Sequence, residues 1–217
     1  MPKKIFSILV SMLFICTIIS VNVFAGSEED PEIIDNEDDL FGALVNAPYR
    51  LRSIIALKML GIESFEMIDL KSAWIFENEN EPEYLFAAVK INDLQFIKDR
   101  AIYSVHWKFN NIKYGVGSHA YSSGETSCFV GVDRSRRLYE SEVEYDLENN
   151  IVTFKFLKVN IGDPQPGDML TNTYAWTAIR FFIGPLSLLF SDGELVKDAA
   201  PFIEDNEDYG RDYIIQY

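Results

Sequence analysis

RAIYSVHWKFNNIKYGVGSHAY, residues 100–121, decides the fold of this chain. It consists of two runs in which apolar and polar residues alternate, joined by Asn110 and Asn111. Asn tolerates the left-handed backbone of a two-residue turn, so the segment predicts a β-hairpin. The turn places the large apolar residues on one side of the ribbon, as the facing pairs Phe109/Ile112, Trp107/Tyr114, Val105/Val116 and Tyr103/Ser118. Turn chemistry and hydrophobic pattern therefore select the same register.

A second hairpin is predicted between residues 143 and 159. A turn at Asn149 and Asn150 pairs apolar residues on one side, as Leu147/Val152, Tyr145/Phe154 and Val143/Phe156, and sets Glu144 opposite Lys155. Further runs typical of strands occupy residues 67–76, 84–91, 126–133 and 174–182, with a loop rich in Pro and Gly at 160–168. About seven or eight strands with one helical run predict an all-β fold, an antiparallel β-sandwich of jelly-roll or immunoglobulin-like type.

The first 25 residues have the pattern of a secretory signal peptide. Lys3 and Lys4 precede an apolar run, and Val23 and Ala25 stand where an export peptidase recognises a cut after Ala25. The alternative is an uncleaved membrane anchor, for which the apolar run is short. We therefore expect a secreted, extracellular protein that meets a membrane only through an uncleaved signal segment.

The chain is strongly acidic, with 19 Lys+Arg against 34 Asp+Glu. Residues 1–25 contain two Lys and no acid, so the processed chain keeps 17 basic residues, and 17 minus 34 gives a net charge of −17. Such a surface repels nucleic acid and anionic lipid and favours cations such as calcium as ligands. Cys128 is the only Cys beyond residue 25 and is expected to be buried, which leaves no internal disulfide.

Three segments follow the predicted cleavage site. Residues 26–39 are mostly acidic and are expected to form a disordered leader. Residues 40–61 predict a short helical segment packed on the sandwich, because apolar residues recur at helical spacing and Gly61 is a natural stop. Its basic residues leave docking on a membrane or on an acidic chain as an alternative. Residues 62–217 are then the β-sandwich domain.

Several stretches carry a resemblance to a known group of domains. They are YLFAAVKINDL (84–94), IYSVHWKFNNIKYGVG (102–117), YDLENNIVTFKF (145–156), NIGDPQPGDMLT (160–171) and GRDYIIQY (210–217). The chain resembles secreted, largely archaeal β-sandwich domains without assigned activity. Those domains occur alone or on subtilisin-like proteases, and they are similar in outline to DOMON and family-nine carbohydrate-binding modules. The resemblance implies a fold rather than an activity, and no haem ligand of the DOMON type carries over.

The polar face of the first hairpin is the predicted ligand-binding surface. Its side chains surround Gly115 and Gly117, which leave a shallow trough in which a ligand ring can lie. The candidate residues are Ser104, His106, Lys108, Lys113, Gly115, Gly117, His119 and Tyr121. The alternative is a sheet face covered by the N-terminal helix or by a partner.

Catalysis has little support in the sequence. His106 and His119 are the only His residues, and the register sets them about 13 Å apart along the ribbon, too far for one zinc ion. Among 34 acidic residues some close pair is inevitable, so no pair can be selected as that of a hydrolase. We therefore expect a non-catalytic module that binds a carbohydrate or another small extracellular ligand. A structural or protein-interaction domain of the cell exterior is the main alternative, ahead of a hydrolase.

A calcium site is predicted in the loop at 160–168. Asp163 and Asp168 flank two prolines in a turn that can present carboxylate and carbonyl oxygens together. Calcium takes about six to eight oxygen ligands, so another loop must contribute, and Asp133 is the candidate. Ordinary turn chemistry is the alternative explanation of both aspartates.

Overall fold

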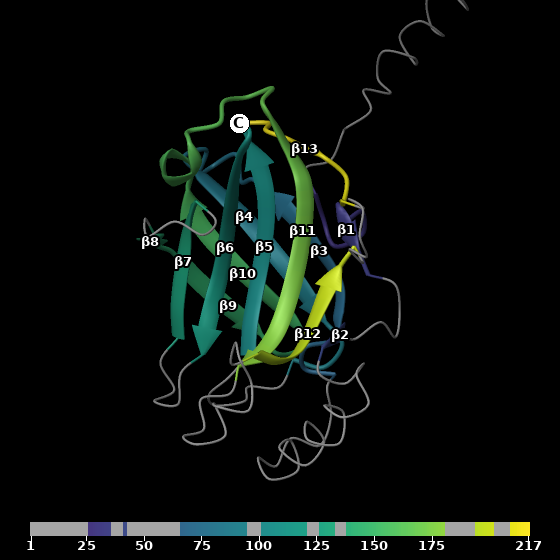
Figure 1. Cartoon of the computed structure of the whole chain (residues 1–217). Helices are drawn as coiled ribbons and strands as arrows, with labels where there is room; N and C mark the ends of the chain where they lie inside the picture. The colour runs from purple at the N-terminus through teal and green to yellow at the C-terminus, as the bar shows by residue number, and fades with distance from the viewer. Residues whose placement is uncertain are drawn as a thin grey trace, which may run out of the picture.

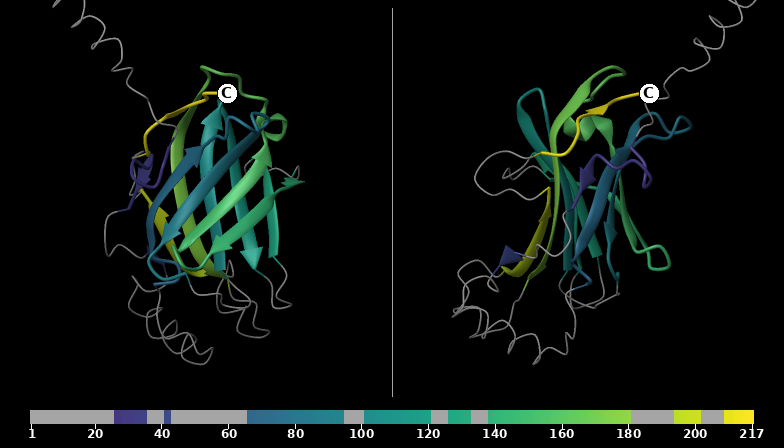
Figure 2. Two further views of the ribbon diagram at one scale, coloured as in Figure 1. Left: turned by 180° about the vertical axis from the view of Figure 1, so that it is seen from behind. Right: turned by 90° about the vertical axis from the view of Figure 1, so that its right-hand side faces the viewer.

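The computed structural model describes residues 26–35, 41–42, 66–94, 101–120, 126–132, 138–180, 194–201 and 209–217. In these residues two antiparallel sheets lie face to face, as Figures 1 and 2 show. The strands of the smaller sheet run obliquely behind those of the larger one (Figure 1). The fold is therefore the all-β sandwich that the strand pattern predicts. Within the same residues, no helix has the length and apolar character needed to cross a lipid bilayer.

The smaller sheet has five strands in the order β1-β3-β4-β10-β9. They are β1 (Ile33–Ile34), β3 (Leu70–Phe76), β4 (Tyr84–Ile91), β9 (Glu142–Asp146) and β10 (Ile151–Leu157), and a short 3-10 helix, η1 (Lys158–Ile161), follows β10. The larger sheet has the order β2-β12-β11-β5-β6-β7-β8, with β13 paired to β11. Its strands are β2 (Phe41–Gly42), β5 (Ala101–Phe109), β6 (Ile112–Ala120), β7 (Thr126–Val132), β8 (Leu138–Glu140), β11 (Met169–Arg180), β12 (Glu194–Ala200) and β13 (Tyr213–Ile214).

The hairpin of β5 and β6 has the register that the sequence predicts. Trp107 pairs with Tyr114, and His106 pairs with Gly115. Asn110 and Asn111 have φ angles of 50° and 63°, the left-handed conformation that the two-residue turn requires. This hairpin occupies the middle of the larger sheet, between β11 and β7.

The register of the second hairpin differs from the prediction by two residues. The observed pairs are Asp146/Ile151, Tyr145/Val152 and Val143/Phe154. Asp146 is the reason, because its Oδ1 accepts the main-chain N–H of Glu148 and of Asn149, each at 3.0 Å. These bonds favour a turn over residues 147–150 in place of a two-residue turn. A shift of two residues keeps every side chain on its predicted side, but it leaves Leu147 in the turn, 49% exposed.

The core lies between the two sheets. Trp107 of β5 is 1% exposed and stacks on Phe156 of β10, with the ring centroids 5.5 Å apart. The other predicted core residues that are buried are Val105, Tyr114, Val116, Cys128, Val152 and Phe154. Tyr145 is half-buried, and its hydroxyl donates to Ser118 Oγ at 3.0 Å. The two hairpins read from the sequence therefore pack against each other across the sandwich.

The prediction of a disordered leader at 26–39 is wrong for the part that the structure describes. Ile33 of β1 pairs with Ala73 of β3 and is fully buried. Nearby, the guanidinium of Arg211 forms an ion pair with Asp30. Main-chain pairing and the burial of an apolar residue thus draw this acidic segment into the smaller sheet.

The helix predicted at 40–61 is not seen at its start. Phe41 and Gly42 form β2, which pairs with β12 at the edge of the larger sheet, so their main-chain groups enter a sheet rather than a helix. Residues 43–61, which contain the rest of the predicted helix, lie outside the described residues.

Candidate functional site

Aromatic and polar side chains gather on the face of the larger sheet that points away from the smaller one. Along β5, Ser104 and His106 point outward, while Val105 between them is buried in the core. Tyr174 of β11 pairs with His106, and Trp176 pairs with Ser104. Figure 1 shows β5 and β11 side by side in the front layer. Strand pairing thus brings two aromatic residues next to the hairpin face that the sequence predicts as a binding surface.

The imidazole of His106 stands at the centre of a row of rings. Its centroid lies 4.7 Å from that of Tyr174, with 11° between the planes, and 6.1 Å from that of Trp176, with 19° between the planes. The indole N–H of Trp176 donates to His106 Nε2 at 2.8 Å. Because an indole nitrogen only donates, Nε2 is the acceptor, and the neutral imidazole carries its proton on Nδ1. We call Tyr174, His106 and Trp176 the aromatic row.

Ser104 and His106 do not form a nucleophile and its base. Ser104 Oγ lies 3.2 Å from His106 Nε2, a distance at which a serine and a general base can meet. However, Nε2 already accepts the indole N–H of Trp176, and the Ser104 hydroxyl donates to the carbonyl of Trp176 at 3.2 Å. The lone pair that would take the proton of the serine is therefore occupied.

The trough predicted above Gly115 and Gly117 is filled by neighbouring side chains. A Cβ atom at Gly115 would lie 2.5 Å from His106 Nδ1, and one at Gly117 would lie 3.1 Å from the Cβ of Ser104. Glycine at 115 is thus what allows the imidazole to lie across β6. At Gly115 the space of the predicted open trough is occupied by the imidazole of His106, which belongs to the aromatic row.

Two lysines border the aromatic row. Lys108 and Lys113 face each other across the hairpin. The Nζ of Lys108 lies 5.8 Å from the ring centroid of Tyr209, whose ring is in turn 6.4 Å from that of Tyr174. Ammonium groups at the edge of a group of rings add hydrogen-bond donors to an apolar platform.

Two predicted site residues remain without a described side chain. His119 pairs with Ile102, as the predicted register requires, but its side chain lies outside the described residues. Tyr121 lies outside them altogether.

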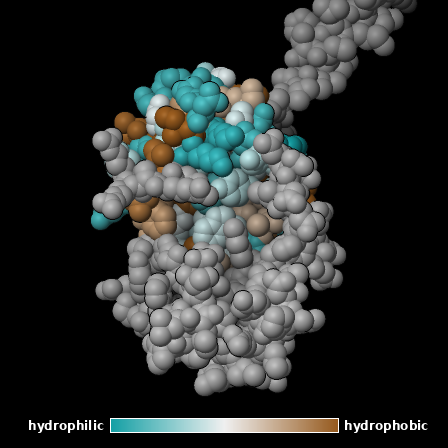
Figure 3. Space-filling model, in the orientation of Figure 1, coloured by the Kyte–Doolittle hydropathy of each residue, from teal (hydrophilic) through white to brown (hydrophobic). Residues whose placement is uncertain are grey.

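In Figure 3, which shows the side of the molecule seen in Figure 1, the coloured surface mixes hydrophilic and hydrophobic residues.

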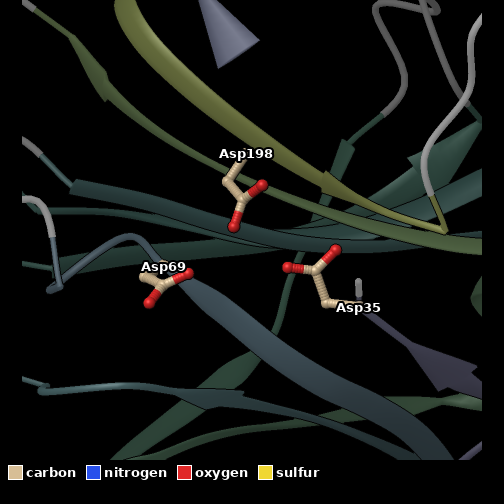
Figure 4. Close-up of side chains that lie close together, drawn as sticks. All are labelled: Asp35, Asp69 and Asp198. Atoms are coloured by element: carbon tan, nitrogen blue, oxygen red, sulfur yellow. The ribbon is translucent and has the colours of Figure 1, made fainter. Parts of the chain in front are cut away.

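Three aspartates from separate elements meet at one edge of the sandwich (Figure 4). Asp35 follows β1, Asp69 precedes β3 and Asp198 lies in β12, and each offers a carboxylate oxygen within 4.8 Å of the others. Asp198 is fully buried and accepts the main-chain N–H of Leu70 at 2.7 Å and of Ala199 at 2.9 Å. Carboxylate oxygens are the ligands that calcium and magnesium prefer. We call these three residues the aspartate triad. Among the described residues, they form a group whose carboxylates could hold a metal ion.

The aspartates predicted to bind calcium stabilise a turn. Asp168 Oδ2 accepts the main-chain N–H of Gln165 at 2.7 Å, and the Gln165 side-chain amide donates to the carbonyl of Asp163 at 2.9 Å. Asp163 also lines a pocket of about 290 Å³ together with Tyr217. Asp133, the third predicted ligand, lies outside the described residues. The turn chemistry named as the alternative therefore accounts for the carboxylate of Asp168.

Sequence reasoning missed Tyr174, Trp176 and Tyr209 as well as the aspartate triad. The first two carried a signal, because they flank Ala175 in a strand-like run and so share one face. Nothing in the sequence says that this strand lies beside β5. The aspartates of the triad are far apart in the chain and form no metal-binding motif, so no sequence signal could have joined them.

Comparison with known proteins found no relative of this chain. No family model matches the chain, and no curated protein or solved structure matches it. The resemblance to secreted β-sandwich domains therefore stays a prediction, and function is inferred from the geometry of the site.

Proposed function

We propose that the chain is a secreted, non-catalytic module that binds a carbohydrate or another small extracellular ligand on the aromatic row. The observation that carries the proposal is the near-parallel alignment of Tyr174, His106 and Trp176 on one face of the larger sheet. Tyr174, His106 and Trp176 are each partly exposed, so the stacked rings form an apolar platform on which the C–H face of a sugar ring can pack. Polar groups at the border of such a platform bind the hydroxyl groups of the ligand and orient it.

The rings are held in place by the fold, which supports the proposal. Stacking and the hydrogen bond from Trp176 fix the plane of His106, and Gly115 provides the space for it. Groups that are ordered before binding lose little conformational entropy when a ligand arrives. Lys108 and Lys113 add donors for hydroxyl or carboxylate groups at the edge of the row.

Binding without catalysis fits the chemistry of the same residues. His106 is the one histidine with a described side chain, and its Nε2 accepts a hydrogen bond from an indole. A base in that state cannot activate the neighbouring hydroxyl of Ser104 or a water molecule without losing the bond that orients it. The aromatic row is therefore better suited to hold a ligand than to transform it.

The test is a glycan array probed with the exported protein, followed by calorimetric titration of the glycan that binds best. We expect Trp176→Ala to weaken binding at least tenfold, which is about 1.4 kcal/mol, because it removes a ring and the donor to His106. Gly115→Ala should also weaken binding, since its Cβ displaces the imidazole. Tyr139→Ala is the matched control, because Tyr139 is 43% exposed on β8, away from the row, and should bind as the wild type does. Unchanged binding by Trp176→Ala would contradict the proposed site.

A protein-interaction domain is the second candidate, and a separate surface favours it. Apolar side chains are exposed around η1 and β13, at the end of the sandwich that carries the pocket. They are Leu157 (36%), Val159 (64%), Met169 (48%), Ile214 (41%) and Tyr217 (45%). Exposed apolar groups gathered at one place are typical of interaction surfaces. Concentration-dependent self-association in sedimentation experiments, abolished by Val159→Asp, would favour this candidate over glycan binding.

A further inference from the structure

Glu32 is a buried acid that the ligand-binding site does not use. It is 8% exposed, and its Oε2 accepts the main-chain N–H of Ile75 at 2.9 Å. Burial raises the pKa of its carboxyl group to about 7, although hydrogen bonds from Ile75 and from its own main chain act in the opposite direction. Among the described residues, the positive charge of Arg211 lowers the pKa of Glu32, and the negative charge of Asp30 raises it. Arg211 and Asp30 form an ion pair with each other. The Glu32 charge also acts on the buried hydroxyl of Tyr213.

Gly26 lies directly against the carboxylate of Glu32. A Cβ atom at position 26 would lie 2.2 and 2.3 Å from the two carboxylate oxygens of Glu32, and 2.4 Å from the carbonyl oxygen of Ile75. Because a Cβ lies about 1.5 Å from its Cα, the Cα of Gly26 is within about 4 Å of both carboxylate oxygens, and its nitrogen is within about 5 Å. A side chain at this position would have no room, so glycine is required for the approach.

The sequence predicts a processing site at the same residue for an unrelated reason. The small residues Val23 and Ala25 predict a cut after Ala25, and this pattern contains no information about Glu32. The nitrogen that such a cut would free lies within about 5 Å of the buried carboxylate. A prediction from the sequence and an independent observation on packing therefore meet at Gly26.

We propose that Gly26 is the amino terminus of the processed protein and that its ammonium group pairs with the carboxylate of Glu32. Processing is the hydrolysis of the bond between Ala25 and Gly26 by an export peptidase. Water supplies the oxygen of the new Ala25 carboxylate, and both of its protons end on the Gly26 nitrogen, which becomes an ammonium group. The ammonium group gives the buried carboxylate a positive partner, so processing stabilises the folded chain. This inference depends on export and not on the ligand-binding function.

The pair predicts a specific dependence of stability on pH. Without the ammonium group, the folded pKa of Glu32 near 7 lies above its ordinary value of 4.5, so stability is lost as the pH rises between these values. With the ammonium group, the charged carboxylate is favoured, its pKa falls and this loss disappears. A free α-amino group has an ordinary pKa of about 7.7 to 8.0, and pairing raises it. The advantage of the free amine is therefore largest near pH 7 and small below about pH 4.5.

The experiment compares the exported protein with the same protein acetylated at its α-amino group in urea and then refolded. N-terminal sequencing and intact mass should identify Gly26 as the first residue. Acetylation should raise the unfolding equilibrium constant at pH 7 at least tenfold, which corresponds to a pKa shift of one unit. The difference should vanish in Glu32→Gln and persist in Glu29→Gln, the matched control at an exposed acid of the same segment.

Three results would overturn the proposal: a different first residue, equal stability of the two forms, or a difference that survives Glu32→Gln. Should Glu32→Gln fail to fold, the pKa of the Glu32 carboxyl, followed by NMR in the wild type before and after acetylation, decides instead. We expect a value at least one unit lower with the free amine. Equal values in the two forms would refute the pair.

Discussion

Replacing Glu77 with Gln should destabilise the fold far more than replacing any surface acid. Glu77 follows β3, and its side chain is 0% exposed; its Oε1 lies 2.5 Å from the Nζ of Lys158, which is 5% exposed at the start of η1. The other oxygen, Oε2, accepts the hydroxyl of Tyr213 at 3.0 Å and the main-chain N–H of Gln216 at 2.6 Å. Lys158 also donates to the carbonyl of Tyr217. One buried carboxylate thus joins the smaller sheet, η1 and the segment that contains β13.

The size of the effect follows from burial. Removing one partner of a buried ion pair leaves a desolvated charge and typically costs about 3 to 5 kcal/mol. Glu77→Gln does this to Lys158 and also weakens the bonds to Tyr213 and Gln216, so we expect a loss in that range. The double variant Glu77→Gln with Lys158→Met removes both charges and should lose less than the sum of the single variants.

The assay is urea unfolding at pH 7, with the free energy of unfolding taken by linear extrapolation. Glu81→Gln is the matched control, because Glu81 and Lys155 form an ion pair at the same distance, 2.5 Å, but are 37% and 23% exposed. A pair open to water is worth about 0 to 1 kcal/mol. If Glu77→Gln cost no more than Glu81→Gln, the argument that burial decides the strength of these pairs would be wrong.

Three further predictions concern the core, the thiol and the cation hypothesis. Trp107→Ala should cost about 3 to 5 kcal/mol in the same assay, since it empties the space beside Phe156, and a loss under about 1 kcal/mol would contradict the face assignment. Burial raises the pKa of the Cys128 thiol to about 12, so a thiol reagent at pH 8 should react slowly with the native protein and rapidly in urea; fast native reaction would contradict this. If calcium binds in the loop at 160–168, calcium at about a hundred times its Kd should add roughly 2.7 kcal/mol to the free energy of unfolding, measured by thermal unfolding in calcium and in chelator. Asp163→Asn or Asp168→Asn should remove this gain. A gain that survives both variants would place the ion elsewhere.

The sequence was most informative where structure depends on neighbours in the chain. The register of the first hairpin follows from Asn110 and Asn111 together with the alternation around them, and both are local. The second hairpin shows the limit of the same method. Its faces were predicted correctly, but the side chain of Asp146 reaches the main chain of Asn149 and sets a longer turn. A turn residue can be recognised from a motif, whereas the competition between two turns of similar chemistry is decided by individual hydrogen bonds.

Composition misled the prediction for the acidic segment. A run of acids with few apolar residues is typical of disorder, yet Ile33 is fully buried and Glu32 is nearly so. The segment is ordered by pairing with β3. Ile33 pairs with Ala73, which lies about forty residues further along the chain. The average composition of a segment cannot predict that one of its apolar residues is buried, because the core that buries it is formed by strands elsewhere in the sequence.

The aromatic row depends on strand order in the same way. Alternation in the sequence sets Tyr174 and Trp176 on one face of their strand and His106 on one face of another, but only the order β11-β5-β6 places the rings in contact. The sequence predicted that Gly115 leaves space for the ring of a ligand. In the structure that space is taken by the imidazole of His106. A glycine facing a bulky residue across a hairpin is therefore ambiguous in a sequence. It becomes informative once the next strand is known, because two aromatic residues on that strand give the displaced side chain a surface against which to stack.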